Sequence, residues 1–306
     1  MNNTDKLIFI YLYICDCYDS ELCLHYQRMS NNYQPELTDQ EVLSIYLYCL
    51  LVEQRYTKQS IYNFADTYLR SWFPDLGTTY ESFLKRINQL HPVFVPLIFC
   101  LLRHKAQHMD TENFRYLEGL LCSLVDSMPV VLAKGARSYT AKVAPTLCNR
   151  GYCNSKRLSY YGVKLHVMGF SRFNRLPLPE FVGITPASEH DLTVFKDQFE
   201  TLLQRVIFGD KAYARQDFEQ WLNKHRDVYI LSPVKKKKGQ EFLPAADKIY
   251  STWVSQIRQP IEAFFNWLIE KTQIQNASKV RSTNGLLTHI FGRFAAAMFS
   301  LTFDFL

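Results

Sequence analysis

Residues 120–127, LLCSLVDS, and residues 205–213, RVIFGDKAY, decide the fold that this sequence predicts. Each stretch contains a short apolar run typical of a buried strand, and each run stops at an aspartate, Asp126 in the first and Asp210 in the second. A right-handed crossover lays the second strand beside the first and parallel to it. Both carboxylates are therefore expected at the carboxyl edge of one sheet, which is where open α/β sheets bind ligands.

The periodicity around these two stretches extends the same pattern. Residues 160–170 alternate, with Val163, Leu165 and Val167 on one face and Lys164, His166 and Met168 on the other. Further strands are predicted at 180–185 and 228–231, and helices at 192–203, where Asp191 is expected to be the cap, at 215–225 and in two stretches from Trp253 onward. This order predicts an α/β domain with a mixed sheet flanked by helices, over residues 116–306.

The first third of the chain, residues 1–115, reads as an all-α domain. Thr38 and Glu41 form a capping box, and helical spacing follows it. Further helices are predicted at about 58–72, 80–90 and 93–108. Short helices carrying the basic pair Lys85 and Arg86 are typical of a helix-turn-helix that reads DNA, although a plain supporting bundle has the same pattern.

Composition sets broad limits on the class of protein. The chain has 306 residues, is 47% hydrophobic and carries a formal charge of +6, so it is expected to fold and is compatible with a nucleic-acid partner without requiring one. No apolar run reaches the length needed to span a bilayer. These features predict a cytoplasmic protein with no membrane partner.

A third acid, Glu262, lies in a basic helical segment downstream. Three acids from two strands and a helix suit hard divalent cations, which prefer oxygen ligands, and leave room for a phosphate. Each acid also suits a structural role. Asp126 and Asp210 fit turns, and Glu262 fits the first turn of a helix that begins at Pro260.

Several motifs resemble the DDE transposases of bacterial insertion sequences over residues 120–265. These motifs are Val125-Asp126-Ser127, Gly151-Tyr152-Cys153, Tyr161-Gly162-Val163-Lys164-Leu165-His166, Thr185-Pro186-Ala187-Ser188-Glu189-His190-Asp191, Gly209-Asp210-Lys211-Ala212-Tyr213, and Arg258 four residues before Glu262. The family often has a tyrosine and a lysine where this chain has Ser255 and Ile269, and Pro260 separates Arg258 from Glu262. Glu270 is therefore the alternative third acid.

The resemblance implies an RNase H-like catalytic domain and a metal-dependent endonuclease with strand transfer. Asp126, Asp210 and Glu262 would hold two Mg²⁺ or Mn²⁺ ions, with Asp126 bridging them. The expected partners are the terminal inverted repeats and the target, both double-stranded DNA, bound by a homodimer associated with the nucleoid. The alternatives are a related Mg²⁺-dependent nuclease without strand transfer, and a catalytically inactive DNA-binding protein derived from a transposase.

Basic residues near the predicted site are candidates for DNA contact. In chain order they are Lys164, His166, Lys211, Lys235, Lys236, Lys237, Lys238 and Arg258, in addition to Lys85 and Arg86. The lysine run also fits a solvated loop, and His166 also fits a buried strand histidine. Contacts of this kind would anchor DNA without reading its sequence.

Overall fold

The computed structural model describes residues 2–26, 36–77, 79–108, 113–153, 157–236 and 239–303. The chain divides into two compact units, one of Met1–His108 with Leu268–Leu306 and one of Met109–Trp267. This division differs from the predicted one because the C-terminal residues join the N-terminal helices. Helix α10 (Arg293–Thr302) is apolar on most sides and packs against α2 (Asp39–Leu51) and α5 (His91–Gln107).

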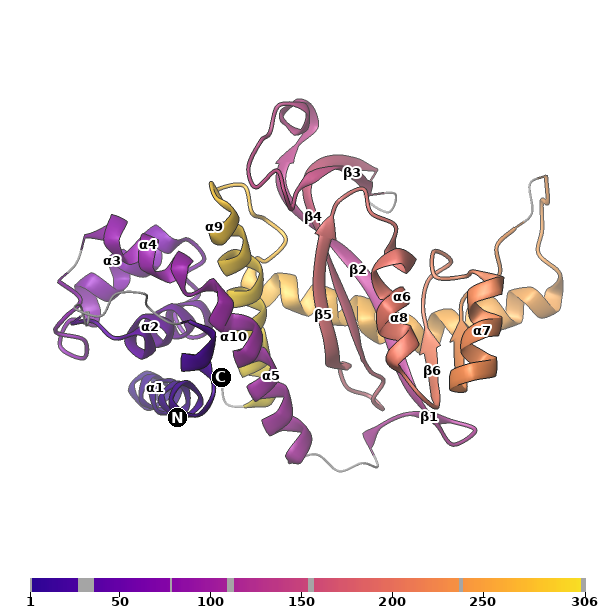
Figure 1. Cartoon of the computed structure of the whole chain (residues 1–306), viewed down its shortest axis with the longest axis horizontal. Helices are drawn as coiled ribbons and strands as arrows, with labels where there is room; N and C mark the ends of the chain where they lie inside the picture. The colour runs from indigo at the N-terminus through magenta and orange to yellow at the C-terminus, as the bar shows by residue number, and fades with distance from the viewer. Residues whose placement is uncertain are drawn as a thin grey trace. The chain divides into compact units, whose positions relative to one another are not determined.

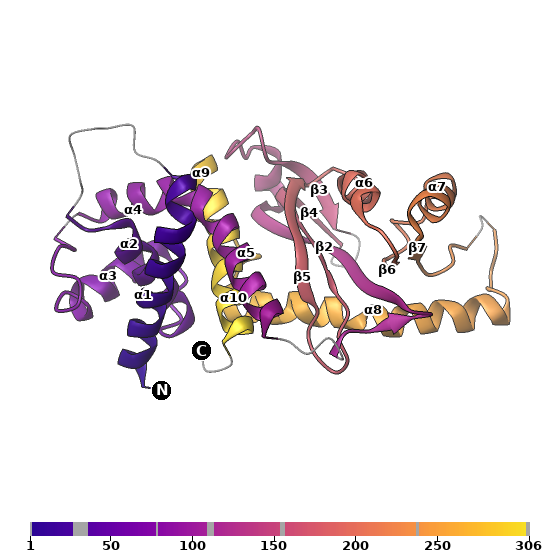
Figure 2. The ribbon, with the colours of Figure 1, turned by 60° about the horizontal axis from the view of Figure 1, so that its bottom comes forward.

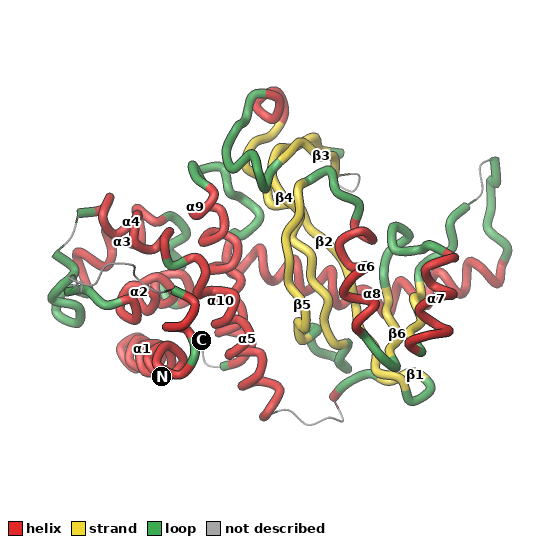
Figure 3. The backbone as a smooth tube through the Cα atoms, viewed as in Figure 1, coloured by secondary structure: helices red, strands yellow, loops and turns green. Residues whose placement is uncertain are grey.

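The first unit is helical (Figure 3). Thr38 caps α2 as predicted, since its hydroxyl accepts from the Glu41 N–H at 3.2 Å and the Glu41 carboxylate accepts from the Thr38 N–H at 2.5 Å. The remaining elements of this unit are α1 (Asn3–Ser20), η1 (Leu22–His25), α3 (Lys58–Tyr68), α4 (Tyr80–Gln89), α9 (Thr283–Leu287) and the π-helical η4 (Thr288–Gly292).

The second unit is an α/β domain built on a mixed sheet. In chain order its strands are β1 (Tyr116–Leu117), β2 (Leu120–Lys134), β3 (Asn149–Cys153), β4 (Leu158–Phe170), β5 (Leu178–Pro186), β6 (Arg205–Phe208) and β7 (Val228–Leu231). The helical segments are η3 (Gly135–Tyr139), α6 (Asp191–Thr201), α7 (Gln216–Arg226) and the first part of α8 (Ala245–Thr272).

The sheet has the strand order β3-β4-β2-β6-β7, and β5 pairs with the part of β4 that β3 leaves open. Strand β6 runs parallel to β2, with Leu124 opposite Phe208, which confirms the predicted parallel pairing. Strands β2, β4 and β5 pair antiparallel. The sheet is therefore mixed, with antiparallel and parallel strands, and it is flanked by helices, which confirms the architecture predicted for this domain.

One prediction about β2 is wrong, because the strand does not stop at Asp126. It continues to Lys134, held by its antiparallel partner β4, with Asp126 opposite Val167. Only the parallel neighbour β6 ends here. Beyond this point one edge of β2 is free of ladder bonds, so Pro129, which has no N–H to donate, fits into the strand.

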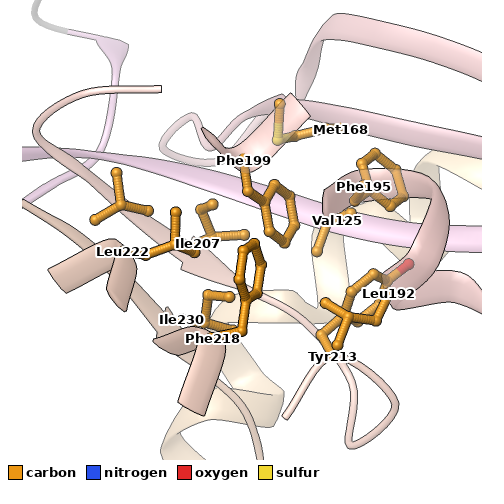
Figure 4. Packing of buried hydrophobic residues seen from close by; sticks show 11 residues of the cluster. Val125, Met168, Leu192, Phe195, Phe199, Ile207, Tyr213, Phe218, Leu222 and Ile230 are labelled. Carbon is orange, nitrogen blue, oxygen red and sulfur yellow. The ribbon is translucent and has the colours of Figure 1, made fainter. Parts of the chain in front are cut away.

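The two faces of the sheet are covered by different helices (Figure 2). Helices α6 and α7 pack on the face that carries Val125, Met168 and Ile207 (Figure 4). Helix α8 lies along the opposite face, where Trp253 packs edge-on against Phe208 at 5.7 Å between ring centres. Because side chains alternate along a strand, Asp126 points toward α8 and its neighbour Val125 toward α6.

Two details of the helices differ from the sequence interpretation. Pro260 does not begin a helix but lies inside the 28-residue α8, so the structural role proposed for Glu262 in a first turn is wrong. Asp191 is not the cap of α6, because the His190 ring accepts from the Leu192 N–H instead.

Candidate active site

Asp126 and Asp210 occupy equivalent positions on two adjacent parallel strands. Each lies two residues beyond the last paired residues, Leu124 and Phe208, and therefore on the same face of the sheet. The Asp210 Oδ1 accepts from the Ala212 N–H at 2.7 Å, which turns the chain sharply after β6. Both carboxylates therefore lie on the face of the sheet that α8 covers.

Gly209 permits this turn by its lack of a side chain. A Cβ at this position would lie 2.7 Å from the Tyr213 ring and 3.1 Å from a Val125 methyl group. Tyr213 is fully buried and packs on Phe195, with ring centres 5.8 Å apart. The tyrosine of the Gly-Asp-Lys-Ala-Tyr motif therefore anchors the loop that presents Asp210.

Arg258 joins Asp126 to Glu262. Its Nη2 lies 2.8 Å from Asp126 Oδ2 and 3.0 Å from Glu262 Oε1. The helical spacing of Arg258 and Glu262 makes this possible despite Pro260, so the predicted one-turn pairing is present. Asp126 and Arg258 are nearly buried, at 17% and 14% side-chain exposure, whereas Glu262 is 56% exposed.

The environment of Asp126 perturbs its ionisation. Burial raises the pKa of Asp126 to about 6, and the nearby charge of Asp210 acts in the same direction. Arg258 and the Ser127 N–H, which donates to Asp126 Oδ1 at 2.8 Å, oppose this increase in the pKa. Two acids held close together in a partly desolvated place attract cations, because a positive charge relieves both burial and mutual repulsion.

A cleft of about 620 Å³ lies beside this group, between the loop after β6 and α8. One face of α8 contributes Lys248, Ser251, Ser255, Arg258 and Glu262, at alternating spacings of three and four residues. Lys211 contributes from the loop. The helix predicted from the sequence begins at Trp253 and therefore misses the α8 residues before it. The polar side chains that recur at helical spacing would have indicated that the helix starts earlier.

A family model described as the transposase DDE domain matches residues 119–299. The chain belongs to the DDE transposase family. Searches among curated proteins and among solved structures found no match. The match spans Asp126, Asp210 and Glu262, and it covers more than half of the chain.

Membership of this family means that the protein is a DNA-binding transposition enzyme with metal-dependent nuclease activity, and that its catalytic domain is RNase H-like. Enzymes of this family generally use divalent metal ions. In the described part of the chain, no helix is long and apolar enough to cross a membrane.

Two of the three acids of this transposase are arranged in a way that suits a divalent cation. Asp126 and Asp210 offer paired carboxylate oxygens, which hard cations prefer. Among the residues that the structure describes, no three His, Cys, Asp or Glu side chains gather closely enough to hold a metal ion. Arg258 supplies the positive charge between Asp126 and Glu262. The aspartate pair therefore fits a cation, and Glu262 is linked to this pair through Arg258.

The two candidates on β4 do not lie at this site. His166 is fully buried, its Nε2 is 2.7 Å from the Thr185 hydroxyl, and it packs against Phe195 of α6. Lys164 donates to Asp191 at 2.9 Å. Both lie on the α6 face of the sheet, opposite Asp126. His166 has no exposed surface, so its prediction as a DNA contact is wrong, whereas the DNA contact of Lys164 stays a prediction.

The remaining basic candidates are placed as follows. Arg86 is mostly buried in an ion pair with Asp39 at 2.8 Å, so it is not available as a surface contact. Lys85 is exposed on α4, and Lys235 and Lys236 are exposed after β7. Lys237 and Lys238 lie outside the described residues.

Proposed function

We propose that this chain is the transposase of an insertion sequence that cuts DNA at the ends of its element and joins the resulting 3′-hydroxyl to target DNA. The observation that carries the proposal is the placement of Asp126 and Asp210 side by side on parallel strands. Arg258, which pairs with Asp126, also lines the neighbouring cleft together with Lys211 and Lys248. Phosphodiester chemistry needs anionic ligands for metal and a cationic surface for DNA, and this group offers both.

The residues divide these tasks. Asp126 and Asp210 would hold Mg²⁺ or Mn²⁺, two ions in all, and Glu262 would be the third acid. When bound, such ions activate water and stabilise the leaving oxygen. Lys211 and Lys248, on the wall of the cleft, would hold the DNA backbone, and Arg258 would fix the orientation of Asp126.

Glu262 is favoured over Glu270 as the third acid for a geometric reason. Glu262 shares Arg258 with Asp126, whereas Glu270 lies eight residues further along α8, about 12 Å of helix rise. Glu270 also belongs to the segment that clusters with the N-terminal helices.

The proposed DNA partners are the terminal inverted repeats of the element and the target duplex. Cutting two ends of one element calls for two copies of the chain, so a homodimer on DNA is part of the proposal. The helical unit, in which Lys85, Asn88 and Asn284 line a pocket, is proposed to contribute to binding of the ends.

A test uses a duplex taken from the DNA that flanks the gene, labelled at one strand. We expect nicking in Mg²⁺ or Mn²⁺, no nicking in EDTA, and joining of the new 3′-hydroxyl to a second duplex. Nicking without joining would indicate a nuclease, and binding without nicking would indicate an inactive DNA-binding protein. Either outcome would contradict the proposed transposition activity.

The same assay identifies the third acid. Glu262→Gln is expected to lower the nicking rate by about a hundredfold or more, since a charged oxygen ligand is lost. Glu270→Gln is the matched control, with a rate close to that of the unaltered chain. The reverse result would assign the role to Glu270.

A further inference from the structure

The segment between Asp126 and Glu180 contains no acidic residue. Residues 127–179 carry nine cations, which are Lys134, Arg137, Lys142, Arg150, Lys156, Arg157, Lys164, Arg172 and Arg175. This exceeds the +6 of the whole chain, so the rest of the chain is net acidic. Positive charge in this protein is concentrated in one stretch of the catalytic unit.

Most of this charge lies on what we call the basic arm, which comprises residues 134–153 and Arg157. The arm contains β3, which pairs with the first residues of β4, and η3, whose segment extends beyond the end of β2 (Figure 1). Five of its cations are exposed: Lys134, Arg137, Lys142, Arg150 and Arg157. In the described part of the chain none of them forms an ion pair with a carboxylate, so their charge is available to a partner.

The arm also presents aromatic side chains to solvent. Tyr139 is 67% exposed and Tyr152 is 55% exposed. The Arg150 guanidinium carbon lies 3.6 Å from the centre of the Tyr139 ring, and Nη2 of Arg150 donates to the Tyr139 hydroxyl at 2.6 Å. This contact holds the guanidinium in place on the surface, and exposed aromatic rings among cations are typical of surfaces that bind nucleic acid.

Hydrogen bonds fix β3 within the domain. The Asn149 amide donates to the Ser188 hydroxyl at 2.6 Å and accepts from the Ser188 N–H at 2.8 Å. Gly151 lets the backbones approach closely, since a Cβ there would lie 2.4 Å from the Ala187 carbonyl oxygen. The base of the arm is therefore part of the rigid sheet.

The register of the sheet places the arm on the same face as Asp126. Val167 of β4 lies opposite Asp126, Tyr161 lies opposite Arg150, and Ser159 lies opposite Tyr152. The three β4 residues differ by even numbers of positions, and directly opposed residues in an antiparallel pair share a face. Arg150 and Tyr152 therefore point to the side of the sheet that carries the acids.

We propose that the basic arm binds the sugar–phosphate backbone of the duplex whose end is cut at Asp126. This inference rests on the proposed function. Along β4, Tyr161 is six residues from Val167, or about 20 Å. That span corresponds to about six base pairs of B-DNA. The arm thus contacts DNA about six to eight base pairs from the reacting phosphate and fixes the direction in which the duplex leaves the cleft.

The first test is the salt dependence of binding to a labelled random-sequence duplex of 30 base pairs, without metal. The triple variant Arg137→Gln/Arg150→Gln/Arg157→Gln is expected to reduce the slope of log K against log salt by about two to three, since each phosphate contact contributes about 0.9. The matched control removes three exposed cations elsewhere, as Lys224→Gln/Lys271→Gln/Lys279→Gln. An unchanged slope in the arm variant, or an equal change in the control, would overturn the proposal.

The second test locates the contact. A photoreactive p-benzoylphenylalanine replacing Tyr152 is expected to cross-link the flanking-DNA duplex about six to eight base pairs from the cleavage position, on one side only. Cross-linking to a second protein chain instead of DNA would overturn the proposal. The salt titration needs no cleavage, so it tests the arm independently of the proposed activity. A salt slope that is the same in the arm variant and the unaltered chain would contradict DNA binding by the arm, whereas absence of nicking would contradict only the transposase activity.

Discussion

Asp210→Asn is expected to lower metal-dependent DNA nicking by at least about a thousandfold, with little change in the stability of the chain. An amide has the shape of the carboxylate and its Oδ1 keeps the 2.7 Å bond from the Ala212 N–H, so the turn after β6 is preserved. What is lost is the negative charge next to Asp126, and ligand charge of this kind supplies several kcal/mol of transition-state stabilisation through the bound cation.

The measurement is the single-turnover nicking rate in Mg²⁺, combined with a thermal unfolding curve. Asp126→Asn should have a similar effect on the rate but should also change stability, because it breaks the bond to Arg258. Asp217→Asn, an exposed acid at the start of α7 in the same unit, is the control. A nicking rate for Asp210→Asn equal to that of the control would show that the site is elsewhere.

Arg258→Gln is expected to destabilise the metal-free chain by about 2–4 kcal/mol. Arg258 and Asp126 form a nearly buried ion pair at 2.8 Å, and removing one partner leaves the Asp126 carboxylate without a counter-charge beside Asp210. A divalent cation bound to the two aspartates would replace that charge. Mn²⁺ should therefore raise the stability of Arg258→Gln by more than it raises that of the unaltered chain.

Urea unfolding in EDTA and in Mn²⁺ measures both effects. Arg70→Gln is the control, because its pair with Asp66 is 60% and 34% exposed and such pairs contribute less than about 1 kcal/mol. In the double variant Arg258→Gln/Asp126→Asn the loss should be smaller than the sum of the two single losses. Equal losses for Arg258→Gln and Arg70→Gln, with no added response to Mn²⁺, would contradict the role given to Arg258.

The parts of the fold that the sequence predicts well are those set by local apolar pattern and chain topology. Strand β7 has the predicted bounds Val228–Leu231, and the capping box at Thr38 marks the start of α2. The right-handed crossover predicted the parallel pairing of β2 with β6. Since both aspartates follow apolar runs, their shared edge could be inferred before any coordinates.

The parts of the fold that the sequence does not predict depend on contacts between segments that lie far apart in the chain. Asp126 looks like a strand end, yet β4 extends the ladder far beyond it. Pro260 looks like a helix start, yet packing of α8 along the sheet outweighs the backbone bond that the proline removes. Lys164 and Arg86 form ion pairs with Asp191 and Asp39, which lie far away in the sequence, so these pairs could not be predicted from the local pattern.

Counting the Mn²⁺ ions bound by the full chain, in the presence of an uncleaved flanking-DNA duplex, tests most directly whether the two aspartates form a metal site. Calorimetric titration of the unaltered chain should saturate at about two ions per chain, and Asp126→Asn/Asp210→Asn should show no saturable binding at the same concentrations. Unchanged number and affinity of bound ions in the double variant would contradict the assignment of Asp126 and Asp210 as metal ligands.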